Sequence, residues 1–392
     1  DLNTAAYNRG GARTSQNRGL VFGGNNPTFL TATEEYNAYY TTGSFGRVEA
    51  DDVHITNDSQ LVVSCSLQIP VYSSNSGIIS SSAGQMWFNS TTKKLNFTQD
   101  VNTWSEVADL ISPKSFTFGS AGAGVNDALF YGGYAPYPTT TATTELWNGT
   151  SWSEVADLQD IMVRMGGTGC STDSAIMTGG TAPIATSVGV ETNTWDGSTW
   201  TEVNDHITSR GCTSLSGTQN AALLSPGVAY GGSGSPTTEE WNGTNWATST
   251  NASLSYGQYD AQMIGTQNDT VKGVGPPQQA NAAHYDGTSW SAINPYSDAI
   301  RSRAGWGTAN AAIYAGGHSN SNTGCAQTEE YNGISWKSVS SLGQGRGYGG
   351  RAGTQSSGML SGGNYGSPNV RHCGNTEQYT TTALATVEID GV

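Results

Sequence analysis

One short segment recurs along this chain and restricts its fold more than any other feature. It reads TELWNGTSW at 144–152, TNTWDGSTW at 192–200, TEEWNGTNW at 238–246, AAHYDGTSW at 282–290 and TEEYNGISW at 328–336. The closing tryptophans are 44 to 48 residues apart, and Trp104 lies 48 residues before the first of them, Trp152. Sequence periods of about 40 to 50 residues are typical of β-propeller blades, so the repeat predicts a ring of such blades.

Each repeat carries the signals of antiparallel hairpins. Asn-Gly or Asp-Gly between two aromatic-bearing strands is a strong hairpin signal, so we expect type I′ turns between the outer two strands of each blade. These turns are Asn148-Gly149, Asp196-Gly197, Asn242-Gly243, Asp286-Gly287 and Asn332-Gly333. Glycine pairs, expected to close the inner hairpin, end the strands ALFYGG (128–133), SAIMTGG (174–180), AAIYAGG (311–317) and GMLSGG (358–363). One blade cannot bury its aromatic face alone, so the blades must stack.

Composition and charge exclude several classes of protein. The 52 glycines disfavour helix, because an interior Gly costs about 1 kcal/mol relative to Ala, and we expect an all-β chain. The formal net charge of −15 would repel nucleic acid, and no apolar run is long enough to insert in a membrane. The start, DLNTAAYNRGG, has neither an initiator Met nor the blocks of a signal peptide, so we expect a processed or partial chain.

The order of signals within the repeat resembles the kelch repeat: Arg, an apolar strand ending Gly-Gly, Glu-x-Tyr/Trp, then Trp. The resemblance covers 101–380 well and 5–40 in part, through GLVFGG (19–24) and TEEYN (33–37). It implies a kelch-like β-propeller. Counting inner-hairpin strands near residues 23, 132, 179, 226, 274, 316 and 362 gives seven blades, and excluding 1–40 leaves six. The unit at 256–290 departs from the pattern at VKGVGPPQQ (271–279) and Ala283, so its inner edge should be irregular.

The period fails between Tyr40 and Trp104. We therefore expect a first or closing blade at 1–40, a small β insertion or joining subdomain at 41–100, propeller blades at 101–380 and a terminal strand at 381–392. The segment YTTTALATVEIDGV (379–392) aligns without gaps on YTTGSFGRVEADDV (40–53), at an offset of 339 residues. Either the natural gene repeats the whole module, or both segments are edge strands of common ancestry.

Two segments, TGSFGRVEADDV (42–53) and GQMWFNSTTKKLNF (84–97), resemble parts of structural proteins of tailed bacteriophages, especially fibre and virion-surface proteins of marine and cyanobacterial phages. The resemblance implies a non-enzymatic virion-surface protein of the tail-fibre or decoration type, for host-surface recognition or particle architecture. Its partners would be other virion subunits and a host-surface glycan or protein, and a homo-oligomer is expected. The alternatives are a secreted bacterial adhesin or extracellular filament subunit at the cell surface, and, less favoured, a carbohydrate-active enzyme.

No group of residues predicts an active site, a cofactor or a metal. A galactose-oxidase-like copper site needs two His and a Cys-linked Tyr, but the five histidines lie apart: His54, His206, His284, His318 and His372. TWDGSTW (194–200) resembles a sialidase Asp-box, which marks a hairpin rather than a catalytic site. We assign no catalytic, binding or metal-ligating residue.

Four sets of residues recur without indicating catalysis. For the recurring arginines we expect a role in blade packing rather than an anion site in the channel: Arg164, Arg210, Arg303 and Arg346. For the recurring glutamates we expect strand pairing or turn capping rather than calcium binding: Glu34, Glu145, Glu239, Glu329 and Glu377. Cys325 and Cys373 precede their repeat Glu by four residues, and free thiols are favoured over a disulfide. The loops 134–143, 181–190 and 318–327 should share one rim, where recognition usually lies.

Overall fold

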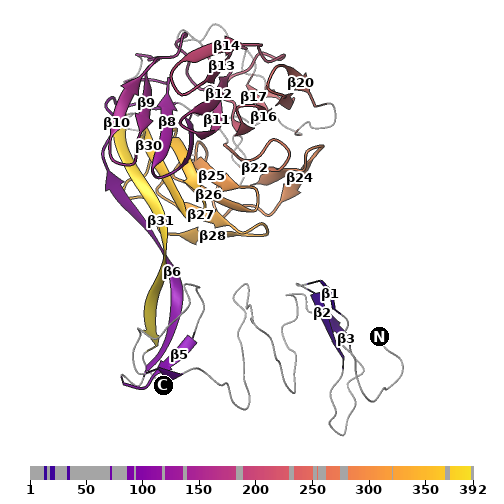
Figure 1. Cartoon of the computed structure of the whole chain (residues 1–392), viewed down its shortest axis with the longest axis vertical. Helices are drawn as coiled ribbons and strands as arrows, with labels where there is room; N and C mark the ends of the chain where they lie inside the picture. Colours follow the sequence, from indigo (N-terminus) through magenta and orange to yellow (C-terminus); the bar gives the residue numbers. More distant parts are fainter. Residues whose placement is uncertain are drawn as a thin grey trace. The chain divides into compact units, whose positions relative to one another are not determined.

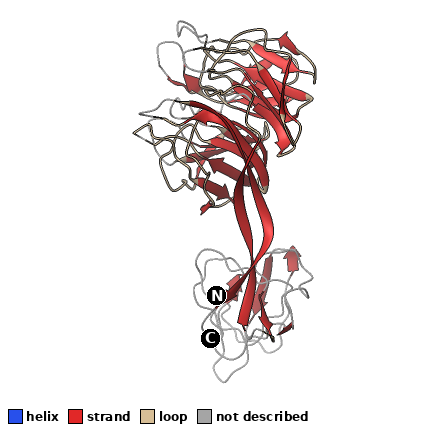
Figure 2. Cartoon of the chain, turned by 90° about the vertical axis from the view of Figure 1, so that its left-hand side faces the viewer, coloured by secondary structure: helices blue, strands red, loops and turns tan. Residues whose placement is uncertain are grey.

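The computed structural model describes residues 13–15, 18–22, 33–35, 71–72, 86–91, 94–116, 120–135, 139–181, 189–228, 234–249, 254, 262–273, 281–319, 321–366 and 371–389 (Figure 1). The chain divides into two units, Asp1–Val71 and Tyr72–Val392. The described residues form strands, turns and loops without a helix (Figure 2), so the all-β expectation is confirmed for them. In the described part of the chain there is accordingly no apolar helix of membrane-spanning length.

The first unit contains one small antiparallel sheet. Its strands are β1 (Arg13–Ser15), β2 (Arg18–Phe22) and β3 (Thr33–Glu35), in the order β1-β2-β3. The short strand β4 (Val71–Tyr72) lies at the boundary between the two units.

The second unit is a β-propeller of six four-stranded blades within the described residues. Blade 1 consists of β7 (Ser120–Gly124), β8 (Asp127–Tyr131), β9 (Thr144–Trp147) and β10 (Trp152–Val155). Blade 2 consists of β11 (Gly166–Ser171), β12 (Ser174–Thr178), β13 (Thr192–Trp195) and β14 (Trp200–Val203). Blade 3 consists of β15 (Leu215–Thr218), β16 (Ala221–Leu224), β19 (Glu239–Trp241) and β20 (Trp246–Thr248), with β17 (Gly227–Val228) and β18 (Gly234–Ser235) as a side hairpin.

The remaining blades repeat the same order. Blade 4 consists of β21 (Met263–Gly265), β22 (Thr270–Gly273), β23 (Ala282–Tyr285) and β24 (Trp290–Ile293). Blade 5 consists of β25 (Ala304–Thr308), β26 (Ala311–Ala315), β27 (Thr328–Tyr331) and β28 (Trp336–Val339). Blade 6 consists of β29 (Gly350–Thr354), β30 (Ser357–Asn364), β31 (His372–Ile389) and β6 (Lys94–Val107), and β5 (Met86–Asn89) pairs with the far end of β6.

The count of seven blades was wrong, and the alternative of six holds. The strand near residue 23, which the count included, is β2, and it belongs to the sheet β1-β2-β3 of the first unit. The ring needs no seventh blade because β6, from the N-terminal side, supplies the outer strand of blade 6 and pairs with β31. The first strands of the six blades contact one another in order round the ring, and β29 of blade 6 meets β7 of blade 1.

A pair of aromatic rings occupies the outer half of every blade. In blades 1 to 5 the last residue of the third strand faces the repeat tryptophan, as Trp147 faces Trp152, and in blade 6 Tyr379, within β31, faces Trp104; the ring centroids are 5.3 Å apart in both pairs. The indole of each outer tryptophan also reaches the preceding blade: Trp200 donates to the Thr144 hydroxyl at 3.0 Å. The corresponding bonds link Trp152 to Thr376, Trp246 to Thr192 and Trp290 to Thr238. The Thr that precedes the repeat Glu position therefore joins neighbouring blades at four junctions, whereas Trp336 and Trp104 donate to the carbonyls of Asn294 and Ser340.

The position of the outer hairpins was predicted correctly, but their turn type was wrong. Each loop spans four residues, as Asn148 to Ser151 do between Trp147 and Trp152, and the Gly149 φ of 93° is positive whereas that of Asn148 is not. The Asn148 Oδ1 accepts hydrogen bonds from the backbone N–H of residues 150 and 151, at 2.9 and 3.0 Å. The side chain thus organises the turn, and a type I′ geometry is not needed.

The glycine pairs do not close the inner hairpin, contrary to the prediction. Gly316 and Gly317 follow the second strand of blade 5 and begin its connection to the third strand. The Gly317 N–H donates to the Arg346 carbonyl of the next blade at 2.7 Å, and a Cβ on Gly316 would lie 2.3 Å from the same oxygen. Glycine is required here because the next blade's connecting loop touches the backbone.

A long two-stranded ribbon leaves blade 6. In other blades the third strand turns back at Asn-Gly or Asp-Gly, but β31 continues past Tyr379 and stays paired with β6 as far as Ile389 and Leu95. The ribbon is the twisted pair of strands below the ring in Figures 1 and 2. It departs from the end of the blades that carries the Asn-Gly and Asp-Gly turns.

Candidate functional site

The opposite end of the blades carries two sets of loops. One set joins each outer strand to the first strand of the next blade, and the other joins the second strand to the third. Short bridges tie the two sets together: Ser115 pairs with Tyr134, Val163 with Thr181, and Arg301 with His318. The second residue of each pair lies at the start of a loop predicted to share one rim. The described parts of the three loops therefore start at the same end of the ring, while residues 136–138, 182–188 and 320 lie outside the described residues.

Besides Asn322 in the loop 318–327, five non-glycine residues at this end have left-handed backbone conformations. They have φ values of 54° to 60°, and each lies twelve residues after a repeat tryptophan: Phe116, Arg164, Cys212, Ser302 and Tyr348. The equivalent residue of blade 4 lies outside the described residues. Left-handed conformations are unfavourable for residues other than glycine, and such residues concentrate at functional sites.

These left-handed residues lie around the axis of the ring at this end, which we call its mouth. Each lies two to four residues before the first strand of its blade, and the first strands contact one another about the axis. The Arg164 N–H donates to the Phe116 carbonyl at 2.8 Å, the Cys212 N–H to the Arg164 carbonyl at 2.9 Å, and the Tyr348 N–H to the Ser302 carbonyl at 3.0 Å. Backbone bonds thus hold neighbouring loops in a fixed arrangement.

Aromatic side chains gather at one side of this mouth. The Phe116 and Tyr348 rings stack with centroids 4.0 Å apart, and Tyr134 meets Phe116 edge-on at 5.6 Å. The guanidinium of Arg164 lies 5.2 Å from the Phe116 ring centre, within range of a cation–π interaction. Phe116, Tyr134 and Arg164 are half-buried, whereas Tyr348 is buried. We call Phe116, Tyr134, Arg164, Tyr348 and His372 the mouth cluster.

His372 completes the mouth cluster. Its ring centroid lies 6.4 Å from those of both Phe116 and Tyr134, and its Nδ1 is 2.5 Å from the Ser115 hydroxyl. Burial lowers the pKa of His372. The cluster thus offers aromatic faces, one guanidinium and an imidazole whose neutral form is favoured, which suits stacking and hydrogen bonding.

Apolar side chains are exposed at the same end. Ile111, Ile161 and Ile207 are 55%, 45% and 59% exposed, and each lies in a loop that joins an outer strand to the next blade. Ile334, which is 63% exposed, lies at the opposite end, so exposed apolar side chains occur at both ends of the ring.

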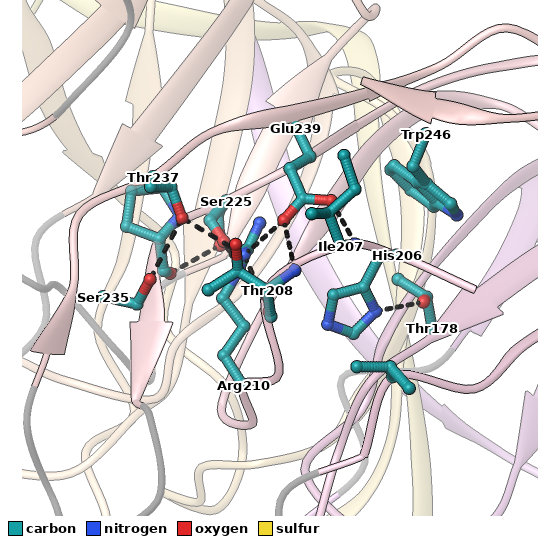
Figure 3. Close-up of polar contacts among 12 residues, drawn as sticks. Thr178, His206, Ile207, Thr208, Arg210, Ser225, Ser235, Thr237, Glu239 and Trp246 are labelled. Atoms are coloured by element: carbon teal, nitrogen blue, oxygen red, sulfur yellow. Dashed lines mark hydrogen bonds and ion pairs between the residues drawn. The ribbon is translucent and has the colours of Figure 1, made fainter. Parts of the chain in front are cut away.

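Three of the four recurring Arg residues form buried ion pairs with the recurring Glu residues behind this end, as Figure 3 shows for blade 3. Arg210 Nη1 and Glu239 Oε1 are 2.7 Å apart, and both side chains are 0% exposed. Glu239 also accepts hydrogen bonds from the backbone N–H of Ile207 at 2.7 Å and Thr208 at 3.0 Å. Arg210 also donates to the carbonyl of Ser225 at 3.2 Å. The predicted turn-capping role of Glu239 and packing role of Arg210 are confirmed.

The charge state of this pair follows from its contacts. Burial acts to raise the pKa of the Glu239 carboxyl, but Arg210 and the backbone donors act against it and the pKa falls below its ordinary value. The carboxylate therefore stays ionised opposite the guanidinium. Buried pairs of the same kind are Lys114 with Glu145, Arg303 with Glu329 and Arg346 with Glu377.

The four predicted arginines occupy three different positions in the structure. Arg210 and Arg346 lie two residues before the left-handed residue, a position that Lys114 holds in blade 1. Arg303 comes one residue after it and reaches the same carboxylate position, whereas Arg164 is itself left-handed and belongs to the mouth cluster. Sequence reasoning grouped these residues by type. Counting twelve residues from each repeat tryptophan would have separated Arg164 and found Phe116 and Tyr348.

The histidines of the described residues do not converge. His206 is 2.9 Å from the Thr178 hydroxyl, His284 pairs with Asp269 at 2.7 Å, and His318 contacts the Asn364 carbonyl at 2.9 Å. No group of three His, Cys, Asp or Glu residues suited to a metal occurs in the described part of the chain, and His54 lies outside it.

Cys325 and Cys373 are free thiols in the structure, as the sequence favoured. The Cys373 thiol is buried and directed to the Gly363 carbonyl at 3.4 Å, and Cys325 is directed to the Thr323 carbonyl at 3.6 Å. Burial raises the pKa of both thiols, which favours the protonated, unreactive form.

Comparison with known proteins supports the fold. No protein-family model and no curated protein matches the chain. A solved structure titled "Structure of YjhT" is similar with a TM-score of 0.58 and 12% sequence identity, over 71% of this chain and 99% of that one. At this identity the similarity concerns the fold alone. The class that fold and ring closure define is a six-bladed β-propeller.

Proposed function

We propose that this propeller is a non-enzymatic attachment module that binds a host-surface glycan or protein through the end of the ring that carries the mouth cluster. The observation that carries the proposal is that two features lie at opposite ends of the propeller blades. The mouth cluster and the variable loops lie at one end of the blades, and the β6–β31 ribbon departs from the other end. A ribbon attached to a larger assembly would leave the loop end free for a partner.

The chemistry of the mouth cluster suits a neutral or anionic surface ligand. Half-buried aromatic rings such as Phe116 and Tyr134 stack against sugar rings or apolar side chains, and Arg164 adds one positive charge beside them. The resemblance of segments 42–53 and 84–97 to phage structural proteins supports a place on the virion surface, in a tail-fibre or decoration protein with kelch-type repeats. A secreted adhesin or filament subunit is the alternative setting for the same module.

Substitution by glycine tests the binding surface and is compatible with the left-handed backbone of the loops. Phe116 and Arg164 have left-handed backbones, which glycine adopts readily, so Phe116→Gly and Arg164→Gly remove side chains at little conformational cost. Ile334→Ser, in an outer hairpin of blade 5 at the ribbon end, is the matched control at a side chain that is 63% exposed. We expect each mouth variant to weaken binding of labelled protein to host cells by about fivefold, since stacking or cation–π contacts are worth about 1 kcal/mol.

The outcome of this assay decides the proposal. Binding that survives both mouth substitutions, or that Ile334→Ser weakens equally, would contradict it. Antibodies against the propeller that decorate phage particles in electron micrographs would support the virion setting. Decoration of bacterial filaments would support the alternative.

A further inference from the structure

The small sheet of the first unit repeats the strand pairing of blade 6. In blade 6, Met359 pairs with Gln378, Leu360 with Glu377 and Ser361 with Thr376. In the first unit, Leu20 pairs with Glu35, Val21 with Glu34 and Phe22 with Thr33. In both sheets, therefore, the residue just before the glycine pair (Phe22 or Ser361) is opposite the Thr of the Thr-Glu dipeptide. The residue one position earlier (Val21 or Leu360) is opposite the Glu. The pairing of Ser15 with Arg18 likewise matches that of Thr354 with Ser357.

The sequences of the two sheets correspond as well. GLVFGG at 19–24 aligns with GMLSGG at 358–363 at an offset of 339 residues. The same offset relates 40–53 to 379–392, while TEEY at 33–36 matches TEQY at 376–379 at an offset of 343, after a shorter connecting loop, so that Tyr379 matches Tyr36 in one alignment and Tyr40 in the other. Strands β1, β2 and β3 are thus the counterparts of β29, β30 and β31, the three strands that close the ring.

Within the described residues the two sheets differ at their outer edge. In blade 6 the edge of β31 is covered by β6, whose Val107, Glu106 and Ser105 face Thr376, Glu377 and Gln378. In the first unit the sheet ends at β3 within the described residues. An uncovered strand edge presents backbone donors and acceptors to any strand of matching register. The pairing of β31 with β6 in blade 6 indicates that a strand equivalent to β6 would fit the edge of β3.

We infer that β1, β2 and β3 are the closing strands of a second propeller, and that the edge of β3 pairs with the strand equivalent to Lys94–Val107 of a second copy of the module. A complete copy cannot donate this strand, because its own β6 is already paired with β31. The donor is a copy for which β1–β3 take the place of β29–β31. This inference is independent of the attachment function proposed above.

A tandem chain tests the inference directly. Residues 54–339 are repeated in front of residue 1, so that residues 1–53 stand where residues 340–392 stand in the present propeller. We expect two ring-shaped densities per molecule in negative-stain electron microscopy, the upstream ring closed by β1–β3. A single ring, with the added residues degraded by limited proteolysis, would overturn the inference.

Two proline substitutions in the tandem chain assign each ring to its closing strands. Val21→Pro disrupts the centre of β2 and should remove only the upstream ring, whereas Leu360→Pro disrupts β30 and should remove only the downstream ring. An upstream ring that persists in Val21→Pro would show that β1–β3 do not close it.

A second measurement serves if the tandem chain fails to fold. A peptide with the sequence KLNFTQDVNTWSEV (94–107) is added to the unaltered 392-residue chain, and backbone amide exchange is followed. Slower exchange at residues 33–35, absent with a scrambled peptide, supports the pairing. Unchanged exchange at saturating peptide contradicts it.

Discussion

Replacing Glu239 by Asn should destabilise the propeller severely, because Arg210 would keep its charge inside blade 3 without a counter-ion. Both side chains are 0% exposed, and the carboxylate receives the guanidinium at 2.7 Å. Removing one partner of a buried ion pair costs about 3–5 kcal/mol. For a unit of this size, that corresponds to a fall of about 5–7 °C in Tm. Arg210→Met should cost somewhat less, because the backbone N–H groups of Ile207 and Thr208 still compensate the carboxylate.

Blade 2 shows which pair of substitutions removes both charges at once. There Met162 and Asn193 occupy the positions of Arg210 and Glu239, so both charges are absent together. We expect Arg210→Met with Glu239→Asn to recover at least about 2 kcal/mol relative to the sum of the single changes, a coupling energy typical of contacting charges. Urea unfolding of the four proteins, followed by tryptophan fluorescence, measures this difference. Additive effects of the two changes would refute the reasoning that the pair is coupled through desolvation.

Two further predictions concern backbone geometry and pH. Gly353 has a φ of 141°, and a Cβ there would lie 2.3 Å from the Gly358 Cα, so Gly353→Ala should lower the free energy of unfolding by about 3 kcal/mol. Gly124 has open space around it, so the control Gly124→Ala should change the free energy of unfolding by less than about 1 kcal/mol. Equal effects of the two substitutions in thermal unfolding would contradict this prediction. Burial, with the positive charge of Arg210, lowers the pKa of His206 to about 4, and burial lowers that of His318 to about 4. Because the unfolded chain then binds more protons, stability is fully present above about pH 6.5 and is lost as pH falls toward 4, by about 1–2 kcal/mol per histidine at pH 5. Replacing both histidines by Gln should flatten the dependence of Tm on pH between 7.5 and 5, and an unchanged slope would argue against these groups.

The blade was predictable because its strands are neighbours in the chain. Trp147 and Trp152 pair across a loop of four residues, so hydrophobic alternation and the Asn-Gly signal report the contact directly. The turn type was missed because the Asn148 side chain caps the loop, a local bond that competes with the expected backbone geometry.

The number of blades was not predictable from the same signals. The strand near residue 23 has the pattern of a second blade strand, and its pairing is indeed that of a blade. A local pattern shows that a segment forms such a strand but not which ring the strand completes. The number of blades depends on whether β6 or another strand pairs with the edge of β31 in blade 6.

The mouth cluster was harder to predict from the sequence than the blades. Phe116, Arg164 and Tyr348 have unrelated side chains, so a search by residue type does not connect them, although each lies twelve residues after a repeat tryptophan. Phe116 and Tyr348 meet only because blades 1 and 6 are adjacent in the closed ring.

The sequence by itself determined the all-β blade, its hairpin positions and its ring-like stacking, since these follow from contacts between residues a few positions apart. Only the tertiary structure decided that six blades close the ring and which side chains form the mouth cluster. Ring closure joins Thr103 to Thr380, which are 277 positions apart, and no local periodicity records a pairing at that distance.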